Sequence, residues 1–249
     1  MKVVLRGPLE PGQNTAIGNT SVVTGGAGNK AQGSGATVSG GEGNLAWDGT
    51  SSIAGGCDNV TGNTSALPVT CNLHGGQTVS GGQANTASGL LSSVSGGSQD
   101  IASGKYSSVS GGYLNTASNF LSSVSGGQNN HADEFASSVT GGWENIAKGT
   151  YSSVAGGETN TAGDFASTVA GGCHNDTGGL FPSSFPCNAT GGETVSGGTG
   201  NVATGVASAI SGGSTNDTAV TAGNSSILGG SGNFASSKCQ TFPATGQSC

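Results

Sequence analysis

The sequence repeats with a period of fifteen residues. Through the middle of the chain a valine recurs at this step, each time two residues before a Gly-Gly pair, at Val94, Val109, Val124, Val139, Val154 and Val169. The same unit continues towards both ends, with further Gly-Gly pairs that begin at Gly25, Gly40, Gly55, Gly81, Gly197, Gly212 and Gly229. A short regular period is typical of chains that stack coils into a solenoid.

Composition excludes several classes of protein. Glycine supplies 50 of the 249 residues, and charged residues are only 8%, which is atypical of a globular enzyme. The glycines follow no every-third rule, which argues against collagen. Six Lys and Arg against a net charge of -7 leave no basic surface for nucleic acid. We therefore expect no enzyme, no cofactor and no nucleic-acid partner.

Fifteen residues are enough for two short strands and two tight turns. In the consensus S-S-V-S-G-G-x-x-N-x-A-x-G, the first strand ends at the Gly-Gly pair and the second runs through Asn-x-Ala. Alternation along the first strand places Val94 with Ser92 on one face and Ser93 with Ser95 on the other. The sequence thus predicts an all-β parallel β-roll, a β-solenoid of about thirteen 15-residue coils, with valine and alanine inside.

Asparagine occupies one position of nearly every repeat. It stands four residues after the first glycine of the pair, and Asp100 is its one substitute. Stacked amides can hydrogen-bond from one coil to the next, as in the asparagine ladders of cross-β assemblies. We expect these asparagines to have a structural role.

Two inserts interrupt the fifteen-residue repeat. The step between Gly-Gly pairs grows to 26 after Gly55 and again after Gly171, and each long step carries two cysteines fourteen apart. We interpret the pairs Cys57–Cys71 and Cys173–Cys187 as disulfide staples, with Cys239–Cys249 as a third. The alternative is a metal site that includes His74 or His174, but these histidines stand at different places in the two inserts, so we expect no metal.

The chain divides into three segments on this reading. Residues 1–13 form an N-terminal lead-in, residues 14–235 form the roll with inserts near 57–78 and 173–194, and residues 236–249 form a disulfide-closed tail. The first twelve residues show no apolar signal-peptide core, and nothing is long and apolar enough to insert into a membrane. Because cysteine pairs persist in oxidising surroundings, we expect an extracellular, cell-surface or virion-surface location, with any export signal outside these residues.

The repeat S-V-S-G-G-x-x-N-T-A-S-G resembles the head repeat of YadA-like trimeric autotransporter adhesins, S-V-A-I-G-x-x-A-x-A-x-G, and similar runs occur in phage-like tail-fibre proteins. The likeness covers roughly residues 14–235. It departs from the family in its period of fifteen instead of fourteen, and in glycine and asparagine where the family has isoleucine and alanine. The resemblance implies left-handed coiling, a homotrimer of parallel rolls, and attachment to a host-cell, matrix or glycan surface.

A column of apolar side chains also favours a trimer. One valine and one alanine per coil bury little area, so a thin roll gains from a further buried surface. The residues five or six before the Gly-Gly pairs offer one, namely Leu90, Leu91, Tyr106, Phe120, Leu121, Phe135, Tyr151 and Phe165. We call this set the apolar column. The open alternative is that it covers the roll's own side.

The inserts are the predicted recognition elements. They concentrate rigid apolar and aromatic groups, which dominate binding hot spots, at Leu67, Pro68, His74, Phe181, Pro182 and Phe185. We therefore expect these loops to meet the partner. Their alternative role is to clasp neighbouring subunits.

Two other functions stay open. Hydroxyl side chains form a regular rank like those of ice-binding (antifreeze) solenoids, at Ser93, Ser95, Ser108, Ser110, Ser123, Ser125, Ser138 and Thr140. Serine lacks the methyl group of threonine, and Ala155 and Ala170 interrupt the rank. The roll could also be a passive structural spacer of a fibre.

Overall fold

The computed structural model describes residues 3–4, 13–62, 75–178 and 191–242, and divides the chain into two compact units, Met1–Gly126 and Gly127–Cys249. Every regular element among these residues is a two-residue β-strand, and none is a helix. Counted over both units, the chain makes about 14 turns of a parallel β-solenoid. The predicted all-β solenoid is confirmed, with about one turn more than expected.

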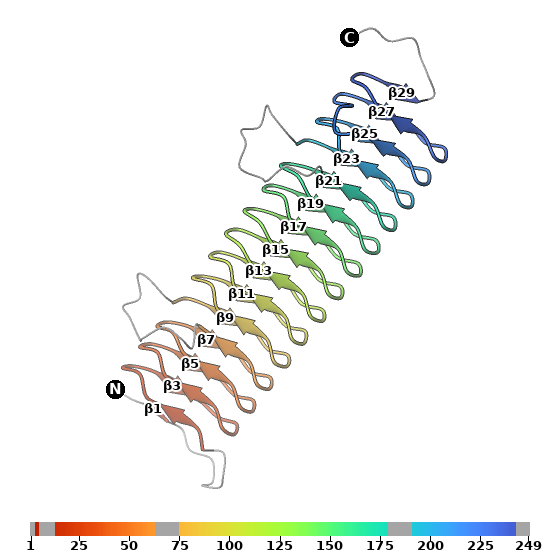
Figure 1. Ribbon diagram of the computed structural model, residues 1–249. Coiled ribbons are helices and arrows are strands. Elements are labelled where there is room, and N and C mark those ends of the chain that lie inside the picture. The colour runs from red at the N-terminus through yellow and green to blue at the C-terminus, as the bar shows by residue number, and fades with distance from the viewer. Residues whose placement is uncertain (1–2, 5–12, 63–74, 179–190, 243–249) are drawn as a thin grey trace. The chain divides into compact units, whose positions relative to one another are not determined.

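In the first unit, the odd-numbered strands form one parallel sheet and the even-numbered strands form another (Figure 1). The odd-numbered strands are β1 (Val3–Val4), β3 (Val22–Val23), β5 (Thr37–Val38), β7 (Ser52–Ile53), β9 (Thr78–Val79), β11 (Ser93–Val94), β13 (Ser108–Val109) and β15 (Ser123–Val124). The even-numbered strands are β2 (Thr15–Ala16), β4 (Lys30–Ala31), β6 (Leu45–Ala46), β8 (Val60–Thr61), β10 (Thr86–Ala87), β12 (Ile101–Ala102) and β14 (Thr116–Ala117).

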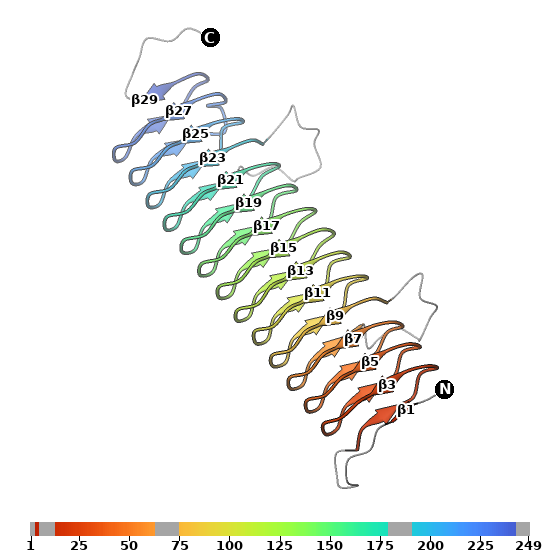
Figure 2. The ribbon, with the colours of Figure 1, turned by 180° about the vertical axis from the view of Figure 1, so that it is seen from behind.

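The second unit repeats this arrangement (Figure 2). Its odd-numbered strands are β17 (Ser138–Val139), β19 (Ser153–Val154), β21 (Thr168–Val169), β23 (Thr194–Val195), β25 (Ala209–Ile210), β27 (Ser226–Ile227) and β29 (Thr241–Phe242). Its even-numbered strands are β16 (His131–Ala132), β18 (Ile146–Ala147), β20 (Thr161–Ala162), β22 (Asp176–Thr177), β24 (Val202–Ala203), β26 (Asp217–Thr218) and β28 (Phe234–Ala235).

The strand register follows the sequence period. Val94 pairs with Val109 one coil further on, and Ala87 pairs with Ala102. Across the first insert the register continues, because Thr86 pairs with Val60 despite the longer step. Like residues therefore stack on like residues within each unit.

Three columns of side chains fill the space between the two sheets. The valines and isoleucines of the odd-numbered strands and the alanines of the even-numbered strands are buried. The third column is the serine that precedes most odd-numbered strands, such as Ser92 and Ser107, each 1% exposed. Ser107 Oγ donates to the Gly104 carbonyl at 2.7 Å, so this buried hydroxyl closes the turn before the strand. The prediction that Ser92 faces inward with Val94, away from Ser93 and Ser95, is confirmed.

The edge of each unit at which the Gly-Gly pairs lie, the Gly-Gly edge, is held by a ladder of buried asparagines. Asn145 Nδ2 donates to the carbonyls of Gly141 and Gly157, both at 2.9 Å. Its Oδ1 accepts from the backbone N–H and from Nδ2 of Asn160, at 3.0 and 3.1 Å. The predicted structural role of the asparagines is confirmed.

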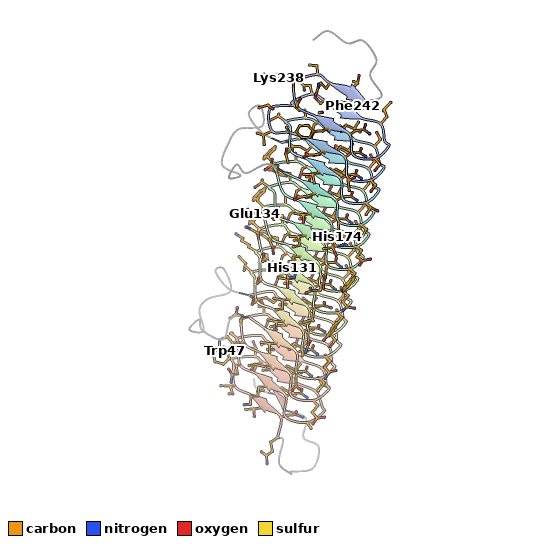
Figure 3. All side chains as sticks on the ribbon, turned by 45° about the vertical axis from the view of Figure 1, so that its right-hand side comes forward. Trp47, His131, Glu134, His174, Lys238 and Phe242 are labelled. Atoms are coloured by element: carbon orange, nitrogen blue, oxygen red, sulfur yellow. The ribbon has the colours of Figure 1, made fainter. Side chains whose placement is uncertain are left out.

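The opposite edge carries the turns that follow the even-numbered strands. We call it the insert edge, because the chain leaves the coil for its inserts here, after Gly62 and after Gly178. In the second unit, Glu134 and Lys238 lie in turns of this edge, on the side away from His174, which follows a Gly-Gly pair (Figure 3).

The two predicted disulfide staples are wrong, because Cys57 and Cys173 carry free thiols. Both lie on the Gly-Gly edge, where Cys57 bridges Glu42 and Gln83, whereas the inserts leave from the other edge, beyond β8 and β22. A disulfide needs Cα atoms within about 7 Å. The predicted partners Cys71 and Cys187 lie outside the described residues. Cys239 takes part in a disulfide, but Cys249 also lies outside them, so this pairing stays a prediction.

The thiol of Cys57 has a local partner instead. Its Sγ donates to Asp58 Oδ2 at 3.5 Å. This hydrogen bond, together with desolvation and the charges of Asp58 and Glu42, raises the pKa of Cys57 above its ordinary value.

Candidate functional site

The apolar column lies along the insert edge of each unit. In the first unit, the rings of Tyr106 and Phe120 meet edge to face with centroids 5.5 Å apart, and Lys105 Nζ lies 5.1 Å from the Tyr106 centroid. In the second unit, Tyr151 makes such contacts with Phe135 at 5.3 Å and with Phe165 at 5.5 Å. Aromatic pairs in this geometry stabilise by about 1 kcal/mol beyond the area they bury.

Despite these contacts, much of the column faces solvent. Leu91 is 50% exposed, Tyr106 42%, Leu121 48% and Tyr151 53%. These four side chains are therefore about half-exposed in the single chain. A row of exposed large apolar groups marks a surface that another molecule contacts.

The column stands at a turn position that has positive φ throughout the roll. Leu91, Tyr106, Leu121 and Tyr151 have φ angles between 56° and 59°. In other coils glycine, threonine or alanine takes this position, also with positive φ, as at Gly35, Thr50 and Ala136. The left-handed turn is therefore a property of the repeat and not of the apolar side chains.

Both insert roots adjoin the apolar column. The first insert returns at Gly75, whose carbonyl accepts from the N–H of Leu91 at 3.1 Å. The second returns at Gly191, beside Phe165, whose carbonyl accepts from the N–H of Gly192 at 2.9 Å. The predicted recognition residues themselves, Leu67, Pro68, His74, Phe181, Pro182 and Phe185, lie outside the described residues. The structure thus places the roots of the inserts and the apolar column on one edge.

Buried polar side chains underlie each root, and our reading of the sequence missed them. In the first coil, Gln77 replaces the buried serine, and its Nε2 donates to Asp48 Oδ2 at 2.9 Å. In the second, Glu193 stands at the position of Gln77, with Asp164 at that of Asp48. Threonine replaces the buried alanine in both coils, as Thr61 and Thr177. The three positions recur 116 residues apart, which was the signal that could have revealed them.

Glu193 is the most perturbed acid of the described residues. Its side chain is fully buried, and only the backbone N–H groups of Glu193 and Gly191 approach its carboxyl oxygens, without reaching the geometry of a full hydrogen bond. Burial, followed by the nearby charge of Asp164, raises the pKa of Glu193 to about 7, although the backbone N–H groups of Glu193 and Gly191 oppose the rise. The carboxyl group is therefore poised between its two protonation states near neutral pH.

The hydroxyl rank lies on the outer face of the odd-numbered strands. Ser93, Ser108 and Ser123 are half-buried, while Ser95, Ser110 and Ser125 are exposed. In the second unit, Ser138 is half-buried, Thr140 is exposed, and Ser153 Oγ donates to Thr168 Oγ1 at 3.3 Å. The two rows run parallel because the strand register is regular. Ala155 and Ala170 leave gaps in the exposed row.

The acidic residues on neighbouring coils of the second unit do not occupy one site. Glu144 and Glu158 lie on the Gly-Gly edge, whereas Asp164 lies on the insert edge. Across residues 3–4, 13–62, 75–178 and 191–242, no group of three potential metal ligands was found. The same ranges hold no helix that could cross a membrane.

Comparison with protein-family models and with curated protein sequences gave no significant match to this chain.

Proposed function

We propose that this protein is an extracellular attachment module, a β-solenoid that binds a host-cell, matrix or glycan surface through its insert edge. The observation that carries the proposal is that, within each unit, members of the apolar column adjoin the root of an insert on this edge. Most of the remaining coil surface is serine, threonine, glycine and asparagine, although large apolar side chains are exposed elsewhere too, as at Tyr113, Trp143 and Phe234. Binding hot spots favour rigid apolar and aromatic groups, which the sequences of the inserts supply.

The proposal includes the assembly of the chain. Left-handed coiling and a parallel homotrimer follow from the resemblance to adhesin heads, and the exposed fractions of Leu91, Tyr106, Leu121 and Tyr151 supply the surface that a trimer needs. In this arrangement the apolar column lies at the seam between subunits, and the inserts extend from the seam towards the partner. A passive spacer has no need of an exposed aromatic column beside the insert roots.

Deleting Leu67–Val69 and Leu180–Phe185 tests the role of the inserts. We expect the shortened protein to lose binding to cultured cells, matrix proteins and glycan arrays while its oligomeric mass is unchanged. A matched control is Tyr113→Ser, which removes a similarly exposed tyrosine, 43% exposed, from the Gly-Gly edge and should leave binding intact. Binding that survives the deletion would place recognition elsewhere, and dissociation into monomers would show that the inserts are clasps.

Ice binding is a second candidate, favoured by the two parallel hydroxyl rows. If these rows order water, the protein produces thermal hysteresis, and Ser110→Tyr in the exposed row of the first unit abolishes it. The matched substitution Ser103→Tyr, on the outer face of the even-numbered strands, should leave hysteresis unchanged. Absence of hysteresis in the unaltered protein would eliminate this candidate.

A further inference from the structure

Asp100 takes the place of an asparagine in the ladder, and it lacks that residue's donor. Its Oδ1 accepts from the N–H and from Nδ2 of Asn115, at 2.8 and 3.1 Å, as an asparagine oxygen does. Its Oδ2 is buried and has no hydrogen-bond partner among the described residues. In the preceding coil, the corresponding Nδ2 of Asn85 donates to the carbonyls of Gly81 and Gly97, at 2.9 and 3.0 Å.

The Oδ2 atom of Asp100 lies where an amide nitrogen lies in other coils. The heavy atom nearest to the ideal Cβ position of Gly97 is Asp100 Oδ2, with the Gly112 carbonyl close by. At the equivalent Gly82, Asn85 Nδ2 and the Gly97 carbonyl stand in these places. An ionised oxygen there faces carbonyl oxygens, which repel it, whereas a protonated one can donate as the amide does.

Glu193 presents the same substitution at the second insert root. Gln77, its counterpart at the first root, uses an amide N–H to donate to a buried aspartate. A glutamate can copy this donor only when it carries a proton. Both oxygens of Glu193 are buried without a described partner, which is costly for an ionised carboxylate.

We propose that Asp100 and Glu193 are held as protonated acids that substitute for amides, so that the ladder at Asp100 and the root of the second insert are locked only while these protons are bound. At the second root, the Glu193 O–H takes the place of the Gln77 amide, and Asp164, whose charge acts on it, takes the place of Asp48. At the ladder, the Asp100 O–H donates to a glycine carbonyl. The first insert root, built with Gln77, lacks this dependence on pH.

The charged surroundings agree with this assignment. Asp164 is the charged side chain that acts on Glu193, and Asp176, on the neighbouring β22, responds to Lys148 and Asp164. Residues 179–190 of the insert include no Asp, Glu, Lys, Arg or His. At Asp100, burial raises the pKa, and the hydrogen bonds from Asn115 oppose the rise without any charged neighbour contributing.

The sign of the pH effect follows from linkage. Between the ordinary carboxyl pKa and the raised value, the folded protein holds protons that the unfolded chain releases. Stability is therefore greatest at acid pH and falls as the pH rises from 4.5 towards about 7, the interval for Glu193. This inference stands independently of what the protein binds.

Thermal unfolding of the unaltered protein, Asp100→Asn, Glu193→Gln and the double variant, from about pH 4 to about pH 8, tests the proposal. We expect the midpoint of the unaltered protein to fall by about 4 °C or more across this range. The double variant should show a shallower profile, because Asp176 and Asp217 keep their raised pKa values, and it should have the higher midpoint at the alkaline end. Gln77→Glu should add a second pH dependence at the first root, and Glu158→Gln, at an exposed position, should change nothing.

Infrared spectroscopy supplies a readout that does not depend on unfolding. The unaltered protein near pH 6 should show the C=O stretch of buried protonated carboxyl groups, and the double variant should lack it. Parallel midpoint profiles for the unaltered protein and the double variant, or absence of the protonated carboxyl band, would overturn the proposal.

Discussion

The two edges of the coil obey different rules. On the Gly-Gly edge, nearly every turn repeats the same glycine pair and the same buried asparagine, and Asn145 alone joins three successive coils. On the insert edge, the turns hold glycine, lysine, leucine or aromatic residues, and the inserts begin there. The Gly-Gly edge is therefore the structural frame, and the insert edge is where sequence variation can serve an interaction.

The Gly40–Gly41 pair shows how little space the Gly-Gly edge leaves for side chains. An ideal Cβ at Gly40 meets no heavy atom within 4 Å. At Gly41, with φ at 86°, it collides with the backbone of Gly56 and lies 2.6 Å from Asn44 Nδ2. At this pair, the first glycine is open to substitution and the second is not.

The largest expected effect on stability distinguishes Gly41 from Gly40. Gly41→Ala should lower the free energy of unfolding by about 3 kcal/mol or more, because it adds strain and displaces the ladder amide. Gly40→Ala should change it by less than about 0.5 kcal/mol. Urea denaturation of both variants provides the measurement. A loss for Gly41→Ala as small as that for Gly40→Ala would mean that the second glycine also tolerates a side chain.

Substitutions in the asparagine ladder should cause a smaller loss of stability, and for one of them the loss should depend on pH. Asn145→Ala removes the amide donor to the carbonyls of Gly141 and Gly157, of which Gly157 keeps the N–H of Trp143 at 3.0 Å, and should cost about 2 kcal/mol at any pH. Asn145→Asp should approach the stability of the unaltered protein at acid pH and lose it as the pH rises, because it recreates the setting of Asp100. Denaturation at both ends of the pH range gives the comparison. Two variants with the same pH profile would argue against a protonated acid in the ladder.

The period of fifteen was enough to predict much of the frame. It indicated which residues face inward, such as Val94 and Ser92, and it identified the asparagine ladder. The cysteines were misinterpreted because their spacing says nothing about which edge each one occupies, and Cys57 lies across the coil from the insert root. Glu193 and Asp164 were missed because side chains distant in sequence meet only once the coils are stacked.

The smallest expected effect concerns these cysteines. If the free thiols of Cys57 and Cys173 do not hold the inserts, Cys57→Ser and Cys173→Ser should each change the free energy of unfolding by less than about 0.5 kcal/mol. Loss of a disulfide that closes a fourteen-residue loop would cost about 3 kcal/mol. Labelling of the native protein with a thiol reagent, followed by mass analysis, identifies which cysteines react. If Cys57 and Cys173 both failed to react with the reagent, the predicted disulfide staples would be supported instead.

Light scattering tests most directly the claim that the insert edge is the interaction surface. The account predicts a trimeric mass for the unaltered protein at micromolar concentration and for Tyr113→Ser, whose tyrosine lies on the Gly-Gly edge. It predicts dissociation for the double variant Tyr106→Ser/Tyr151→Ser, which removes exposed rings from the apolar column while sparing the buried core. A monomeric mass for the unaltered protein, or equal dissociation of the Tyr113→Ser variant, would contradict it.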